Sequence, residues 1–181
     1  MSSPRSVSFC RDPHRGFDSF YLKHHVSIDC RTAELVARYA AVAWEQLRNE
    51  SPAATRSKFL LKIIFNENSR KPGYKIRGTS IVVVNLAHHP LDLDSPGLFA
   101  VQELDLRETI AEELHHVVYH RVFGEKGKDF KFDPEDGHPG VIHYYAFNRH
   151  ELEALRFCVR TVGARAELLR EVEEFLAGCK V

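Results

Sequence analysis

The chain has 181 residues, of which 44% are hydrophobic and 28% are charged, so it is long enough for one folded domain with an apolar core. Twenty-five basic residues balance 25 acidic ones, which excludes a general electrostatic basis for binding nucleic acid or an anionic membrane. The four cysteines lie far apart and form no C-x-x-C pair, which excludes the usual pattern of a structural zinc cluster.

The first 18 residues are polar and contain Pro, Arg and Gly, so we expect a flexible N-terminal arm over 1–18 and a single domain over 19–181. The arm has no apolar segment of the kind that a signal peptide requires. No apolar run in the chain approaches the length that spans a membrane. We therefore expect a cytoplasmic protein that does not enter a membrane.

Four segments in the first half of the chain carry secondary-structure signals. Residues 20–28 have short strand-like character. Asp29 can cap a following helix of roughly 18 residues, which a Ser-Pro pair ends. Residues 58–66 form a β-rich run, and residues 79–86 include four successive β-branched residues, typical of a strand buried on both faces.

The second half of the chain is predicted to be helical. A helix over 106–124 ends at Gly124, a residue suited to the position after a helix C-terminus. A charged loop follows, then a helix that begins near Asn148 and a final amphipathic helix over 164–181. This order predicts an α+β fold with a small mixed sheet, one helix that carries the site and further C-terminal helices.

The first of these three helices contains the stretch ETIAEELHHVVYH. Its apolar residues recur at helical spacing on one side. The opposite side carries Glu112, His116 and His120, each four residues from the last, with Glu113 beside them. Two side chains one turn apart can bind one metal ion, and a glutamate beside them can act as a general base on water. His115 points away from this stripe.

A glutamate four residues before a histidine is also common on the solvated face of a helix, so the argument needs a second motif. The stretch NRHELEALRF, after the charged loop, supplies two candidate carboxylates. At 100° per residue Glu151 borders the buried stripe of this helix, whereas Glu153 lies farther outward. We choose Glu151 as the metal ligand and keep Glu153 in reserve.

With these two motifs in this order, the chain resembles the ImmA/IrrE family of zincin metallopeptidases. Members carry a phrase such as LRFTLAHELGHVLLH where this chain has LRETIAEELHHVVYH, and gluzincins take their third ligand from a downstream helix such as ELEALRFC. The resemblance covers residues 58–165. It implies a zincin-like fold with residues 79–86 at the sheet edge, zinc as the metal and Glu113 as the base.

Glu112 stands where the family has its first metal-ligating histidine, and this substitution leaves several ligand sets open. Glu112, His116 and Glu151 would form a harder, more anionic site that favours Mn or Fe over Zn. His116 and His120 with one carboxylate would form a 2-His-1-carboxylate set, which suits Zn or non-haem Fe(II).

Three functions are consistent with these motifs. The first is a metal-dependent hydrolase, a peptidase acting on a protein substrate, with Glu113 as general base. The second is a catalytically inactive zincin-like scaffold that binds a protein regulator, and the third is a non-haem iron enzyme. Retention of Glu113 favours the first, and loss of the first histidine favours the second. The resemblance also implies cleavage of a protein regulator in a stress or regulatory response.

Three further residues are candidates for substrate contact. His89 follows the strand over 79–86, in a loop that lies near the cleft of zincins. His143 flanks the charged loop and could act as an electrophile. Tyr144 could supply a phenol that stabilises an oxyanion. For each residue, a surface or packing role is the alternative interpretation.

Overall fold

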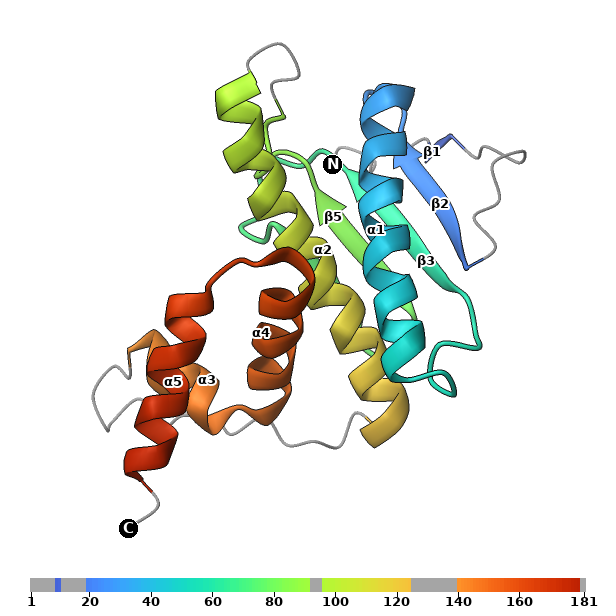
Figure 1. Ribbon diagram of the computed structural model, residues 1–181. Helices are drawn as coiled ribbons and strands as arrows, with labels where there is room; N and C mark the ends of the chain where they lie inside the picture. Colours follow the sequence, from blue (N-terminus) through green and yellow to red (C-terminus); the bar gives the residue numbers. More distant parts are fainter. Residues whose placement is uncertain (1–8, 11–18, 92–95, 125–139, 180–181) are drawn as a thin grey trace, which may run out of the picture.

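The computed structural model describes residues 9–10, 19–91, 96–124 and 140–179. Within these residues the chain forms a five-stranded sheet and five helices (Figure 1). This arrangement confirms the predicted α+β class with a small mixed sheet. Most of the predicted N-terminal arm over 1–18 lies outside the described residues.

The sheet has the strand order β1-β2-β3-β5-β4. Its three central strands, β2, β3 and β5, are mutually parallel, whereas β1 and β4 run antiparallel at the two edges. The strands span Phe9–Cys10 (β1), Phe20–His25 (β2), Phe59–Ile64 (β3), Gly73–Lys75 (β4) and Ile81–Asn85 (β5).

Strand β5 is not the edge strand that the family resemblance implied. It lies between β3 and β4, with Val83 paired to Lys62 on one side and to Tyr74 on the other. The edge position belongs to β4, which begins at Gly73, the second residue of a Pro-Gly pair. Burial of Val82, Val83 and Val84 confirms the prediction that this strand is buried on both faces.

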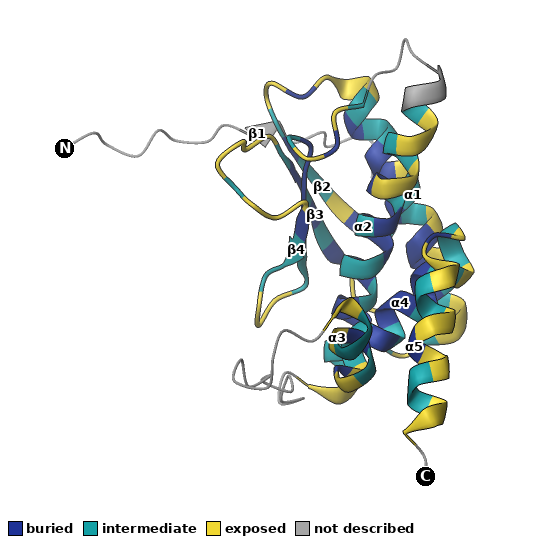
Figure 2. Cartoon of the chain, turned by 90° about the vertical axis from the view of Figure 1, so that its left-hand side faces the viewer, coloured by how far each residue is buried: buried dark blue, intermediate teal, exposed yellow. Residues whose placement is uncertain are grey.

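Helix α1, Cys30–Glu50, connects the parallel strands β2 and β3. It begins as predicted, because the side chain of Asp29 accepts a hydrogen bond from the Thr32 backbone N–H at 2.9 Å. Trp44 is fully buried, and its ring centroid lies 4.5 Å from that of Phe59 on β3. Helices α1 and α2 lie on the same side of the sheet (Figure 2).

Helix α2, Pro96–Phe123, is the longest helix of the described residues and begins ten residues before the predicted start at 106. The sequence did not predict a helix over these ten residues. A proline in the first turn of a helix is tolerated, because the N–H that it lacks would have no partner there. The helix ends as predicted at Gly124, which has a φ of 74°.

Three shorter helices follow: α3, Val141–Phe147; α4, Arg149–Val162; and α5, Ala166–Gly178. Helices α4 and α5 match the two predicted C-terminal helices, whereas α3 was not predicted as a separate element. No helix of the described residues is long and apolar enough to cross a membrane.

Two hydrophobic clusters hold these elements together. The main core joins the sheet, α1 and α2, and includes Trp44, Phe59, Leu61, Ile63, Val84, Ile110 and Leu114. The C-terminal cluster joins α3, α4 and α5 through Tyr145, Leu152, Leu155 and Val172. Helix α4 bridges the two, because its Phe157 and Cys158 belong to the main core. Helix α2 therefore lies between α1 and α4 (Figure 1).

Candidate metal centre

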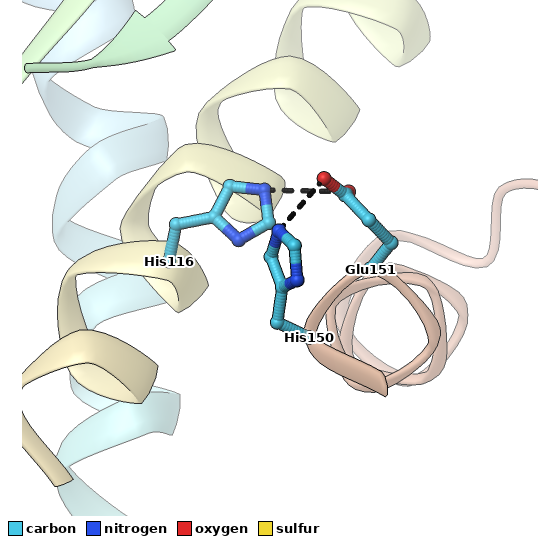
Figure 3. Close-up of side chains that lie close together, drawn as sticks. All are labelled: His116, His150 and Glu151. Atoms are coloured by element: carbon cyan, nitrogen blue, oxygen red, sulfur yellow. Dashed lines mark ion pairs between the residues drawn. The ribbon is translucent and has the colours of Figure 1, made fainter. Parts of the chain in front are cut away.

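Three side chains from two helices converge between α2 and α4 (Figure 3). His116 comes from α2, and His150 and Glu151 come from the first turn of α4. His116 Nε2 lies 3.5 Å from Glu151 Oε2, and His150 Nε2 lies 3.0 Å from Glu151 Oε1. One ligand atom from each of the three residues lies within 4.8 Å of the other two. We call this group the ligand cluster.

The position of α4 brings this cluster together. Asn148, with a φ of −118°, interrupts the helix between α3 and α4, so that a new helix begins at Arg149. Leu152 anchors the start of α4 in the C-terminal cluster, and Phe157 anchors its middle in the main core against α2. The first turn of α4 is thereby held opposite His116.

The donor set fits a divalent cation. Imidazole nitrogen and carboxylate oxygen bind Zn²⁺ at about 2.0–2.2 Å, so two ligands of one ion lie at most about 4.4 Å apart. The separations of 3.0 and 3.5 Å fall inside this limit. The remaining separation is no more than 4.8 Å, which is close to this limit. Three protein ligands with an open fourth position are the pattern of catalytic zinc.

Within the cluster, Glu151 and His116 each favour the charged form of the other. Burial raises the pKa of Glu151, but hydrogen bonds from His116 and His150 outweigh it and hold the pKa well below its usual range. Burial lowers the pKa of His116, but its hydrogen bond to Glu151 and the neighbouring carboxylates raise the pKa above its usual value. A bound cation would therefore take the place of the His116 proton as the positive partner of Glu151.

Glu113 lies beside the cluster on α2 and faces strand β4. Burial raises its pKa to about 7, despite the charge of His116 and a hydrogen bond from the Lys75 backbone N–H. The strand reaches this position because Gly73 has no side chain: a Cβ there would lie 2.5 Å from Thr109 Cγ2 on α2. A carboxylate with a pKa near 7 is suited to general-base catalysis at neutral pH.

Glu112 and His120 do not join the ligand cluster, although both were candidate ligands. Glu112 Oε1 lies 4.0 Å from His116 Nε2, and the ring centroids of His120 and His150 lie 6.2 Å apart. The group whose ligand atoms all lie within 4.8 Å of one another contains neither residue.

Glu151, rather than the reserve Glu153, is the carboxylate of the cluster. Glu153 instead pairs with Arg156 on the same helix at 3.0 Å. His115 is not a member of the cluster, and its ring lies 5.6 Å from that of Phe157 on α4. Helical angles and the family pattern both favour Glu151 over Glu153.

His89 is not placed to contact a substrate, which argues against its predicted role. Its side chain is fully buried, and Nδ1 lies 2.9 Å from Asp105 Oδ2 on α2. The loop after β5 therefore packs His89 against the first half of α2 instead of presenting it on the surface. Burial lowers the pKa of His89, against the opposing effect of Asp105.

The two candidates on α3 occupy different environments. His143 packs against α5, with its ring centroid 4.7 Å from that of Phe175. Tyr144 hydrogen-bonds to Glu151 of the ligand cluster, and burial together with this carboxylate raises the pKa of Tyr144 well above its usual value. Of the three residues proposed for substrate contact, Tyr144 is the one in contact with the cluster.

His150 was missed by the sequence analysis. The signal that could have found it is its position directly before Glu151. Since Glu112 stands where the family has its first histidine, an imidazole beside the chosen carboxylate was a further candidate ligand.

Comparisons with protein family models, with curated proteins and with solved structures found no match to this chain. The functional argument therefore stands on the residues of the site and on their geometry.

Proposed function

We propose that this chain is a metal-dependent hydrolase, a peptidase of zincin-like architecture similar to the ImmA/IrrE family, which acts on a protein substrate. One observation carries the proposal: two imidazoles and one carboxylate, from His116, His150 and Glu151, converge next to the half-buried carboxylate Glu113. The preferred metal is zinc.

The chain's own residues supply most of the chemistry. A bound Zn²⁺ would polarise the substrate carbonyl and make water reactive near neutral pH. A carboxylate oxygen of Glu113 takes a proton from the attacking water and delivers it to the leaving nitrogen. The Lys75 N–H holds that carboxylate in place. The Tyr144 hydroxyl holds Glu151 through its hydrogen bond.

His150 takes the place for which Glu112 was proposed. A set of two imidazoles and one carboxylate leaves more Lewis acidity on the metal than a set with two carboxylates. Glu112 remains 4.0 Å from His116 and outside the group of three ligand atoms. This difference in donor set supports zinc over manganese.

The same donor set supports a second candidate. Two histidines and one carboxylate also form the facial triad of non-haem Fe(II) enzymes. Glu113 separates the two candidates, because a general base beside the metal has a role in hydrolysis and no defined role in iron-dependent oxygen chemistry.

The first test is the metal content of the chain, purified without a histidine tag after growth with added Zn, Mn and Fe. We expect about one equivalent of zinc per chain, since binding of the ion stabilises the assembled site. Less than about a tenth of an equivalent of any metal would contradict the proposal and leave the inactive scaffold. A full equivalent of iron would favour the second candidate.

The second test is the substitution Glu113→Gln, with peptide-bond cleavage measured on a mixture of denatured proteins. We expect a fall in rate of about 10²–10⁴-fold with unchanged zinc content, because the base is lost and the ligands remain. Glu153→Gln is the matched control, since it removes a carboxylate outside the cluster. Equal rates for wild type and Glu113→Gln would exclude general-base hydrolysis.

A further inference from the structure

The turn between α4 and α5 contains a strained residue, Arg165. Its φ of 56° and ψ of 28° lie in the left-handed region. It is the one non-glycine residue with a positive φ among the described residues. A side chain with a Cβ adopts this conformation at a cost, so contacts elsewhere must hold it there.

The contacts of the Arg165 side chain reach two other helices. Its Nε pairs with Glu108 Oε1 on α2, and its Nη1 donates a hydrogen bond to Tyr145 Oη on α3 at 2.8 Å. Both partners are buried, Glu108 at 7% exposed and Tyr145 at 6%. A buried carboxylate is costly without a charged or hydrogen-bonding partner. The guanidinium thus ties α2, α3 and the α4–α5 turn together.

These are the elements that build the ligand cluster. Glu108 lies about two turns before His116 on α2. Tyr145 follows Tyr144, which hydrogen-bonds to Glu151. Helix α4 therefore meets α2 at both ends: through the cluster at its start, and through Arg165 just after its last residue.

We propose that Arg165 is a positioning residue for the metal centre. Its two contacts fix the placement of α4 along α2, and with it the distance from His116 to His150 and Glu151. Arg165 is not a member of the cluster and acts through Glu108 and Tyr145. The inference rests on the proposed metal-dependent function.

Two measurements on the full chain test this role. Competition with a coloured chelator gives the Zn²⁺ affinity, and the visible absorption spectrum of the Co²⁺-loaded protein reports ligand geometry. For Arg165→Gln we expect about tenfold weaker Zn²⁺ binding and an altered Co²⁺ spectrum. Arg165→Lys is expected to remain about threefold weaker than wild type, because one ammonium cannot reproduce the two-sided contact of the guanidinium.

Arg160→Gln is the matched control, because Arg160 also forms a cross-helix ion pair, 3.0 Å from Glu50, but joins α4 to α1. It should bind Zn²⁺ within about twofold of wild type. Tyr145→Phe removes only the hydroxyl that accepts from Arg165 and decides the matter if the Arg165 variants do not fold. We expect it to weaken binding about threefold.

The possible failures are distinguishable. If the wild-type chain binds Zn²⁺ but folded Arg165→Gln shows the same affinity and the same Co²⁺ spectrum, the positioning role is wrong and the metal site stands. Unchanged values for Tyr145→Phe, when no Arg165 variant folds, would overturn the role equally. If the wild-type chain binds no metal, the proposed function fails and this inference fails with it.

Discussion

The two sides of α2 meet different physical demands. The side toward α1 and the sheet is apolar, with Ile110 and Leu114 fully buried in the main core. The side toward α4 buries Glu108 and His116, which are polar and ionisable. An apolar side chain needs only a close-packed environment, whereas each buried polar group needs a partner of defined chemistry at a defined distance. The ligand cluster forms on the side of α2 that faces α4, where each buried polar group has a specific partner.

The largest expected effect comes from the apolar side. Leu114→Ala should lower the free energy of unfolding by about 2–5 kcal/mol, because it leaves a cavity in the main core. Urea denaturation measures this change. Val122→Ala on the same helix is the control, since Val122 is 51% exposed and should change stability by less than about 0.5 kcal/mol. Similar losses of stability in the two variants would mean that burial of Leu114 in the main core is not the cause.

The polar side should respond through metal binding. His150→Ala should weaken Zn²⁺ affinity by at least about 100-fold, because it removes a ligand. Glu112→Gln should weaken it by less than about fivefold, because that carboxylate lies outside the cluster. Chelator competition measures both. The reverse order of effects would restore Glu112 as the ligand and exclude His150.

A smaller effect is expected where strand β4 touches α2. Gly73→Ala places a methyl group against Thr109 Cγ2, and overpacking of this kind costs about 1–3 kcal/mol. Peptidase activity should fall as well, because the displaced strand moves the Lys75 N–H away from Glu113. Urea denaturation and a cleavage assay measure the two changes.

Two further variants make the test of this contact specific. Gly140→Ala is the control, since a Cβ there would meet no atom within 4 Å. Thr109→Ser in the Gly73→Ala background removes the clashing methyl group and should recover most of the lost stability. No recovery would mean that the close approach of β4 to α2 is not the cause.

The smallest effect is a pH dependence that comes from His115. Burial lowers the pKa of this imidazole from 6.5 to about 3. Between these two pH values, His115 is therefore protonated in the unfolded chain and neutral in the folded chain. Its contribution to stability is complete above pH 6.5 and falls as the pH drops from 6.5 toward 3, by about 1 kcal/mol per pH unit.

Substitution of His115 isolates this contribution from the other groups that titrate in acid. Denaturation curves at pH 6.5 and 5.5 should show a decrease in stability that is about 1 kcal/mol smaller for His115→Leu than for wild type. An equal decrease in both proteins would show that His115 is protonated in the folded chain.

Features that depend on a single helix could be predicted from the sequence. The Asp29 cap, the side of α2 that carries His116 and the choice of Glu151 over Glu153 all follow from helix geometry, and the structure bears out each placement. The start of α2 at Pro96 was not predicted from the sequence, although the first turn of a helix accepts proline.

Contacts between distant elements could not be predicted in the same way. The inner position of β5 depends on where the three-residue strand β4 pairs, and His150 becomes a neighbour of His116 only when α4 docks on α2. That docking is set by Phe157 and Leu152 in two separate hydrophobic clusters. Neither cluster is visible in the local pattern of the residues that form the site.

Because α4 bridges two hydrophobic clusters, ion binding and folding should be thermodynamically linked. His116 belongs to a helix of the main core, whereas the first turn of α4, with His150 and Glu151, is held by the C-terminal cluster. We expect α3, α4 and α5 to open together before the sheet does when no ion is bound. With an ion, opening also requires its release, so amide hydrogen exchange should slow even in α5, a helix that supplies no ligand.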